Sequence, residues 1–548
     1  MFRSIGAVAL TGLLMTSPGL AAPVAETRDP AAINAVINAA LPDDQAAMKA
    51  HVMFLASDAM RGREAGSPEY DIAAQYVAAQ FYAAGLRPAG DAGSYLQQVP
   101  LVTYHPADHG DFVLTRKGAE PLRLLFGEEY VPGAIPGRTE AAFDAPVVFV
   151  GYGIVAPQYK RNDYAGVDVK GKIVAYLVGA PGTYQSEERA HFASQATKAI
   201  LAEAHGAIGA LLIQRGPGRG GQGWDQVRTT WARRDGSGEI AGVPQLATLS
   251  EKGAAKLFDG AKTPWTALVK RAGNGDPALP AEQLSGSLTV ALHTVSQPGA
   301  SSNVAGLIPG SDPKLGQEVV ILSAHLDHLG VGAPVNGDAI YNGAEDNAIG
   351  IASLIEEAKR FKLSGKPPRR SVMFLAVTAE EKGLIGSSWF AAHPTVPIDR
   401  IVADVNLDMP IISYRFEDMT VFGAERSTLG PIVAKAVSGL GVTLSPDPDP
   451  AQSFFVRSDH YNFVRKGIPS VFLWPGQAGP GKAAFDDFLA HRYHQPSDDL
   501  TQPLDWSQGI RFVDANYAIA REIADGDARP RWNKGDFFGL LYNGYGAK

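Results

Sequence analysis

Five side chains that can bind metal ions occur in order along the chain, each inside a short polar motif. They are His325 in AHLDH, Asp346 in EDNAIG, Glu381 in AEEKG, Asp408 in NLDMP and His494 in RYHQPSD. Two zinc ions about 3.5 to 4 Å apart need a bridging carboxylate, and each ion needs a nitrogen and an oxygen donor beside an open position for water. Two imidazoles and three carboxylates supply that set, so the sequence predicts a site for two zinc ions per chain.

Each of these motifs, taken alone, has an ordinary structural explanation. A single histidine, or an Asp-Asn pair at the start of a helix, is more often a hydrogen-bonded polar group or an N-cap than a metal ligand. The Glu380-Glu381 pair could be the solvated start of a helix. The metal hypothesis is favoured because the ordinary explanations would have to hold independently for every member of the series.

The elements that must position these side chains form an alternating pattern after about residue 301. The apolar runs QEVVILSAH, SVMFLAVTA, IVADVNLD and PSVFLWP are typical of buried strands, and helical stretches separate them. His325 and Asp408 close the first and third runs, Glu381 follows the second, and His494 lies in a loop beyond the fourth. Ligands bind at the carboxyl ends of strands in such sheets. The pattern predicts an α/β domain with a mixed, mostly parallel sheet flanked by helices.

Asp346 is expected at the start of a helix instead of the end of a strand. The apolar residues Ile351, Leu354, Ile355 and Ala358 that follow it have the spacing i, i+3, i+4, i+7. The start of this helix can therefore face the same crevice as the strand ends.

The chain before residue 301 contains two regions with different sequence patterns. Residues 41–100 read as helices, and in DIAAQYVAAQFYAAGL we expect Ile72, Tyr76, Ala79 and Phe81 to share one face. From about Ala145, the β-rich runs VVFVGYGIV and KIVAYLVGA, the helix ATKAILAEAHG and the strand AIGALLIQ are separated by Gly- and Pro-rich turns. This second region contains no metal-site motif and is interpreted as an inserted domain.

The composition and the amino-terminal residues limit the classes of protein to which the chain can belong. With 548 residues and 45% hydrophobic composition, the chain is too long for one ordinary domain, and 57 acidic against 49 basic residues argue against nucleic acid as the main partner. Residues 1–22 resemble a signal peptide whose apolar stretch is shorter than the ~20 residues that span a bilayer. There are no cysteines. We expect an exported protein, periplasmic or extracellular, without stable membrane insertion after cleavage and with its oligomeric state open.

Together the motifs AHLDHLG, GAEDNAIG, TAEEKGLIGS, VNLDMP, RSDHYNF and YHQPSDD resemble the co-catalytic dizinc aminopeptidase family of secreted bacterial leucyl-type aminopeptidases, which includes glutamate carboxypeptidase and the transferrin receptor. The segments FLASDAMRGREAGSPEY and GLRPAGDAGSYLQQV are similar to the lead-in of this family. With the signal peptide predicted over 1–22, the resemblance implies the first part of the peptidase domain over 23–134 and an inserted β-rich protease-associated domain over 135–290. The catalytic domain would follow over 291–528, with a tail over 529–548.

The resemblance also implies a role for each ligand. Asp346 would bridge both metals, His325 with Asp408 would complete one site, and Glu381 with His494 would complete the other. These assignments require the side chains to converge from elements far apart in the sequence.

Four further residues acquire implied roles. Glu380 would be the general base, and Asp327 would orient the His325 ring from outside the first shell of ligands. Asp498 would do the same for His494. Tyr493 resembles a family tyrosine that stabilises the oxyanion, with a simply packed aromatic ring as its alternative.

The implied activity is hydrolysis of peptide substrates from the amino end. The first alternative is a carboxypeptidase of the same architecture, in which Arg457 would bind the substrate carboxylate; pairing of Arg457 with an acid such as Asp459 is equally favoured. A glutaminyl cyclase is disfavoured by the full ligand set. The alternative from another class is a metal-free binding protein, as in the receptor branch of the family.

Residues 218–223 satisfy GxGxxG and follow a strand-like run, but no convincing helix begins there, so a dinucleotide site is rejected. The surrounding RGPGRGGQGWDQVRTTWARR mixes five arginines with Trp224 and Trp231, as proteins that bind single-stranded nucleic acid can. For an exported acidic protein, a solvated loop or one that limits access of longer substrates is favoured.

Overall fold

The computed structural model describes residues 30–216, 229–233, 242–273 and 279–548. The predicted signal peptide and the GxGxxG match lie outside the described residues. Helix α1 (Pro30–Ile37) belongs to an N-terminal unit that ends at Ala39, and residues 40–548 form one compact unit. Among the described residues, no helix is both long and apolar enough to cross a membrane.

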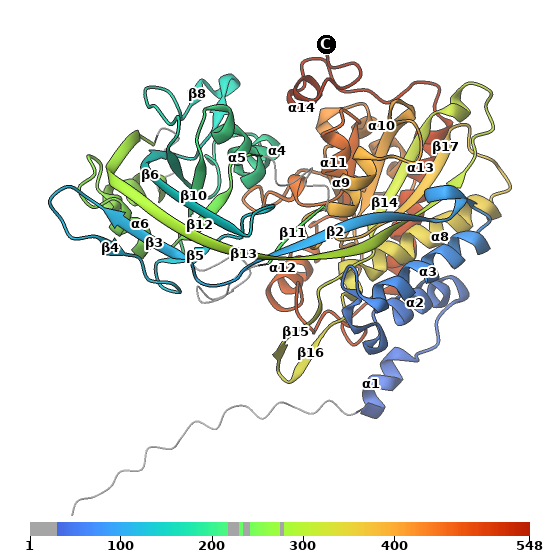
Figure 1. The fold of residues 1–548 in the computed structure, drawn as a ribbon. Helices are drawn as coiled ribbons and strands as arrows, with labels where there is room; N and C mark the ends of the chain where they lie inside the picture. The colour runs from blue at the N-terminus through green and yellow to red at the C-terminus, as the bar shows by residue number, and fades with distance from the viewer. Residues whose placement is uncertain (1–29, 217–228, 234–241, 274–278) are drawn as a thin grey trace, which may run out of the picture. The chain divides into compact units, whose positions relative to one another are not determined.

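A sheet with parallel central strands lies at the centre of the carboxyl-terminal half (Figure 1). Strand β14 (Val319–His325) pairs in parallel with β17 (Ser371–Val377) and β18 (Ile401–Leu407), and β18 pairs in parallel with β21 (Ser470–Pro475). Strand β19 (Asp418–Phe422) continues the sheet antiparallel to β21. Every residue of the four parallel strands is buried, which explains their unbroken apolar runs. The predicted α/β class is confirmed.

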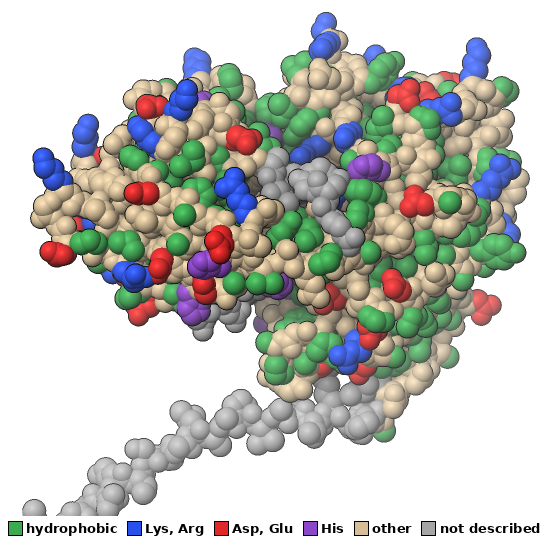
Figure 2. Space-filling view, in the orientation of Figure 1, with side chains coloured by type: hydrophobic (Ala, Val, Ile, Leu, Met, Phe, Trp, Pro, Cys, Tyr) green, Lys and Arg blue, Asp and Glu red, His purple; other side chains and the backbone are tan. Residues whose placement is uncertain are grey.

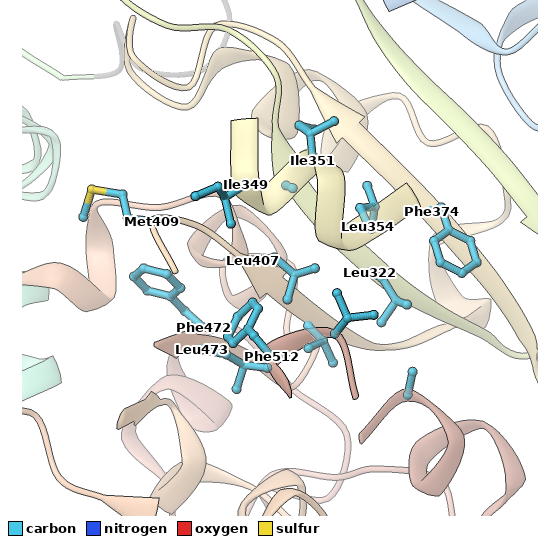
Figure 3. Packing of buried hydrophobic residues seen from close by; sticks show 14 of the residues in the cluster. Leu322, Ile349, Ile351, Leu354, Phe374, Leu407, Met409, Phe472, Leu473 and Phe512 are labelled. Carbon is cyan, nitrogen blue, oxygen red and sulfur yellow. The ribbon is translucent and has the colours of Figure 1, made fainter. Parts of the chain in front are cut away.

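Helices cover both faces of this sheet. Successive residues of β14 point to opposite sides: Leu322 packs in the larger core with α8, and Ile321 packs in a second core with Phe390 and Phe463. The first face is covered by α2 (Asp43–Leu55), α3 (Pro68–Ala83), α8 (Ile349–Leu363), α10 (Leu429–Ser438) and α13 (Trp506–Asp525). The second face carries α9 (Ile385–Ala392) and α11 (His460–Val464). Figure 3 shows Leu322, Leu354 and Phe374 in the first core.

The predicted apolar stripe of α8 is confirmed, whereas that of α3 is partly wrong. Ile351, Leu354, Ile355 and Ala358 are all fully buried. On α3 the buried face consists of Tyr70, Ala73, Ala74, Val77, Ala78 and Phe81, while Ile72 is 53% exposed and Ala79 is also exposed. Alanines occupy positions on both faces of α3, so its sequence has little contrast between faces.

A long strand joins this sheet to a second one. Strand β13 (Ala281–Ile308) pairs with β6 (Glu140–Val150) and β3 (Asp111–Thr115) in its first half, then with β2 (Leu96–Pro106), and finally with β17. The second sheet also contains β9 (Ile173–Leu177), β10 (Gly209–Ile213) and β12 (Gln245–Leu249), and the pairs β6–β9, β9–β10 and β10–β12 are parallel. It has its own apolar core around Phe149, Leu211 and Leu288.

The β-rich runs predicted for this region are strands, and the helix predicted at ATKAILAEAHG is α5 (Gln195–Ala204). Three further helices lie among them: α4 (Ser186–Ala193), α6 (Glu251–Leu257) and α7 (Trp265–Gly273). The remaining described elements are β1 (Arg87–Pro88), β4 (Leu122–Arg123), β5 (Tyr130–Pro132), β7 (Val155–Ala156), β8 (Arg161–Asn162), β11 (Thr230–Arg233), β15 (Gly330–Val335), β16 (Asp338–Tyr341), β20 (Thr443–Ser445), α12 (Gly481–His491) and α14 (Phe537–Leu541), with short helical turns between them. Figure 2 shows acidic and basic side chains interspersed on the visible face of the described residues.

Helix α4 carries a buried polar contact with the carboxyl-terminal half. Glu187 forms an ion pair with Arg426, Glu188 lies 3.3 Å from the same guanidinium, and Asp536 also lies 3.3 Å from it. Burial raises the pKa of Glu187, while Arg426 opposes the rise. His191 Nδ1 is 2.7 Å from Tyr461 Oη. A buried cation shared by three carboxylates connects α4 with the turn before α10 and the start of α14, and the His191–Tyr461 contact connects it with α11.

Candidate metal centre

The candidate ligands converge at the carboxyl ends of the parallel strands. His325 is the last residue of β14, Asp408 directly follows β18, and Glu381 lies in the loop after β17. Asp346 lies in the short turn η6 (Ala344–Ala348) that leads into α8. His494 follows α12 in a loop, with a positive φ of 57°. The arrangement matches the positions expected from the sequence.

Asp346 lies between two pairs of donors. Its Oδ1 is 3.1 Å from His325 Nε2, which is 3.0 Å from Asp408 Oδ1. Its Oδ2 is 3.4 Å from His494 Nε2, which is 3.1 Å from Glu381 Oε2. Tetrahedral ligands about 2.0–2.2 Å from a zinc ion are about 3.3–3.6 Å apart, so these distances suit ligands of one ion on each side of Asp346.

The charges of the cluster also suit divalent cations. Glu380, Glu381, Asp346, Asp408 and Asp327 all have buried or largely buried side chains. Burial lowers the pKa of His494, but Glu381 and Asp346 raise it more, and its pKa reaches about 10. So many carboxylates in a dry site are costly unless positive charge is placed among them. The donor set therefore fits two zinc ions.

Asp327 contacts the site through two different parts of the residue. His325 Nδ1 is 3.1 Å from the main-chain oxygen of Asp327. The Asp327 carboxylate instead accepts hydrogen bonds from the main-chain N–H groups of Glu380, at 3.0 Å, and Glu381, at 3.3 Å. The main-chain oxygen orients the imidazole, and the side chain holds the loop that carries the two glutamates.

Asp498 likewise holds main chain instead of an imidazole. Its two carboxylate oxygens accept hydrogen bonds from Glu345 N, at 2.9 Å, and Asp346 N, at 3.0 Å. Asp498 therefore fixes the turn of the bridging carboxylate, whereas the sequence led us to expect it beside His494.

An open cavity adjoins the cluster. Its polar lining includes His325, Asp346, Glu380, Asp408, Arg457, Ser458, Tyr493 and His494, and its apolar lining is Met409, Phe454, Phe472 and Trp474. Burial raises the pKa of Glu380; His325 opposes the rise and Asp408 adds to it, leaving the pKa well above its usual range. Arg457 Nη2 donates to Tyr493 Oη at 3.1 Å, and the Tyr493 ring stacks on His494.

Three residues at the site were not assigned from the sequence. His328 Nδ1 is 2.8 Å from Glu381 Oε1, the oxygen that is not directed at His494. Ser458 Oγ donates to Asp408 Oδ2 at 2.6 Å. The fully buried Arg63 donates to the main-chain oxygens of Leu326 and Gly343 at 2.8 and 2.7 Å. All three stand inside quoted motifs, but no spacing rule says which atoms they contact.

We expect His328→Asn to weaken metal binding mainly on the Glu381 side. The ring lies 2.8 Å from the outer oxygen of Glu381, and loss of a residue that positions a metal ligand typically reduces metal affinity about 10- to 100-fold. A titration against a competing chelator that resolves two binding steps measures this change. Ser458→Ala, which removes the contact to Asp408, is the matched control for the other side. Equal weakening of both steps in His328→Asn would contradict the expectation.

Paired histidine and carboxylate donors around one shared aspartate, at the strand ends of an α/β sheet, form a cluster that fits two metal ions. The model of peptidase family M28 matches residues 303–520 of the chain.

The chain is also similar to named proteins. The chain is 28% identical over 248 residues to leupeptin-inactivating enzyme 1 of Streptomyces exfoliatus, covering 42% of this chain and 51% of that protein. It is 29% identical over 254 residues to the probable leucine aminopeptidase 2 of Aspergillus oryzae, covering 42% and 46%. The chain thus spans about half the length of these curated relatives. It is also 25% identical over 458 residues to the probable glutamate carboxypeptidase VP8 of Zea mays, covering 76% and 59%.

The fold is shared with a solved structure. The aminopeptidase from Aneurinibacillus sp. strain AM-1 superposes with a TM-score of 0.51 at 22% sequence identity, over 88% of this chain and 93% of that chain. At this identity the likeness shows a common fold.

Proposed function

We propose that the protein is a dizinc exopeptidase that removes residues from the amino end of peptides. The observation that carries this proposal is the division of the two Asp346 oxygens between two His–carboxylate pairs, beside a glutamate that lines the same cavity. His325 with Asp408 would hold one zinc ion, and His494 with Glu381 the other. Bound zinc would polarise the scissile carbonyl and acidify the attacking water.

Glu380 is proposed as the general base. It lines the cavity next to His325 and Asp408, and Asp327 fixes its main-chain N–H. Its raised pKa suits a carboxylate that accepts a proton from the attacking water and passes it to the leaving amine.

Tyr493 is proposed to stabilise the oxyanion. Arg457 donates to the Tyr493 oxygen, so the phenol proton does not need to point at Arg457 and can be donated into the cavity. A donor already held in place costs little reorganisation when charge develops on the substrate oxygen. The stacking of Tyr493 on His494 fixes the ring beside the cluster.

The charge around the cavity favours attack from the amino end. Carboxylates near the metals can hold an ammonium group, whereas a carboxypeptidase needs a cation for the substrate carboxylate. Among the described residues that line the cavity, Arg457 is the one Lys or Arg. Its guanidinium already donates to Tyr493 and to Gln452 O, and it lies over the Phe454 ring.

We expect peptides with a free amine and an amidated carboxyl end to be cleaved from their first residue. N-acetylated peptides with a free carboxyl end should resist, because their amino end carries no charge for the carboxylates to hold. Mass spectrometry of the products over time identifies the end attacked, and addition of a chelator should stop cleavage. The opposite preference would exclude the aminopeptidase proposal.

A carboxypeptidase is the second candidate. The similarity to the probable glutamate carboxypeptidase of Zea mays spans 76% of the chain, and Arg457 supplies a cation at the cavity. In that case Arg457→Met should raise KM for peptides with a free carboxyl end and leave amidated peptides unaffected.

We also propose that the protein is exported, as residues 1–22 indicate. We further propose that the inserted region limits the access of longer peptides to the cavity or contacts these peptides. Arg219 and Trp224, which the sequence suggested for that contact, lie outside the described residues.

A further inference from the structure

A short strand from the inserted region joins the ribbon that leads into the catalytic sheet. Strand β11 pairs antiparallel with β2, with Trp231 opposite Thr103 and Arg233 opposite Leu101. The other edge of β2 pairs with β13 over the same stretch. The strand therefore completes a three-stranded ribbon, seen beside β2 in Figure 1.

The side chain of Trp231 packs against the loop that carries the candidate general base, on the side away from the cavity. It adjoins a buried apolar cluster made of Ala65, Val99, Leu101, Ala379 and Ile385. Ala379 directly precedes Glu380, and Ile385 begins α9. The described residues that line the cavity do not include Trp231, so this side chain contacts the loop and not the cavity.

Further contacts connect the same strand to the loop and to the helix that follows it. Lys382 Nζ lies 5.5 Å from the centre of the Trp231 ring and 2.7 Å from Glu64 Oε1. The buried Arg233 donates to the main-chain oxygen of Ser388 on α9 at 3.1 Å. Trp231 and Arg233 stand two residues apart, so one face of β11 contacts both the loop and the helix that follows it.

The loop needs such support because its backbone is strained. Ala379 and Leu384 have positive φ values of 54° and 58°, on either side of the two glutamates. Residues other than glycine hold this conformation only when their surroundings determine it. Asp327 supports the inner side of the loop by accepting the N–H groups of Glu380 and Glu381. Trp231 supports the outer side.

We propose that Trp231 is a positioning residue for Glu380, through which the inserted region holds the general-base loop in its working geometry. This inference rests on the proposed function of Glu380. Loss of the ring would let the loop relax, and a displacement of about 1 Å at a catalytic group can cost about 10²-fold in rate.

The first experiment compares Trp231→Ala, Trp231→Phe and Thr230→Ala in the full-length protein, with an aminoacyl p-nitroanilide as substrate. This substrate has one amino acid and a small leaving group, so it lacks the further residues through which a longer peptide could reach the inserted region. We expect Trp231→Ala to lower kcat about 10- to 100-fold, with KM and the metal content nearly unchanged. Trp231→Phe should recover most of the rate, and Thr230→Ala on the neighbouring position of the strand should be normal.

The second experiment tests whether the effect passes through Glu380. In a Glu380→Gln background the general base is already lost, so adding Trp231→Ala should lower the residual rate little further. Hydrogen exchange of the amides of residues 378–386 should be faster in Trp231→Ala than in the unmodified protein.

The outcomes separate this inference from the proposed function. If the unmodified protein cleaves no substrate, the proposed function fails, and the exchange measurement still tests the contact. If the unmodified protein is active, a normal kcat in Trp231→Ala overturns the inference. An equal fall in kcat with and without Glu380 also overturns it, because Trp231 would then act on the structure in general.

Discussion

Glu380→Gln is expected to retain two metal ions per chain and to lose about 10²- to 10⁴-fold in kcat, which is the usual contribution of a general base. Glutamine keeps the size of the side chain and its main-chain contact with Asp327, but it accepts no proton. Glu380 lines the cavity, and the oxygen that approaches His494 belongs to Glu381. Metal analysis and steady-state kinetics on the same preparation measure both quantities.

Glu381→Gln is the matched control, because it makes the same chemical change one residue later. Glu381 Oε2 is 3.1 Å from His494 Nε2, so this variant should lose metal from that side while the His325 side keeps its ion. The assignment of roles is wrong if Glu380→Gln loses metal and Glu381→Gln keeps both ions.

The sequence predicted the parallel sheet and the convergence of the candidate ligands at its strand ends, for a physical reason. Strands buried on both faces must be apolar throughout, so a polar residue that closes such a run marks a strand end. His325 and Asp408 were placed in this way, and the structure brings them to 3.0 Å. The regular apolar spacing after Asp346 similarly predicted α8.

Contacts made by main-chain atoms could not be predicted in this way. Asp327 and Asp498 are both close to imidazole ligands in the sequence, yet their carboxylates accept hydrogen bonds from main-chain N–H groups. Which atom of a residue faces which neighbour depends on turn geometry that residue types do not specify. Arg63 illustrates the same limit, since it is fully buried and donates to main-chain oxygens from distant segments.

The association of the inserted region with the catalytic half also escaped sequence reasoning. Strand β13 serves both sheets within one continuous run, so no change of composition marks the boundary. Glu187 and Arg426 are far apart in the sequence, and each is an ordinary charged residue when considered alone. Trp231 was interpreted as part of a solvated or substrate-facing loop, but it packs against Ala379 and Ile385.

Asp346→Ala is expected to weaken both metal sites together. Its two oxygens lie 3.1 Å from His325 Nε2 and 3.4 Å from His494 Nε2, so one substitution removes a donor from each side. The loss in affinity should exceed the about 10- to 100-fold that follows removal of a residue outside the ligand shell, because a bridging ligand itself is lost. Without metal, hydrolysis should fall below detection.

Two single-site variants make this prediction decisive. Asp408→Ala removes a donor beside His325 only, and Glu381→Ala removes one beside His494 only. Each should weaken one binding step in a titration that resolves two, whereas Asp346→Ala should weaken both. If the unmodified protein holds one ion tightly and no second, or if Asp346→Ala weakens a single step, Asp346 does not bridge two metals. The oxygens of Asp346 would then serve one metal and one hydrogen-bonded imidazole, and a mechanism that uses a single zinc ion would have to replace the two-metal proposal.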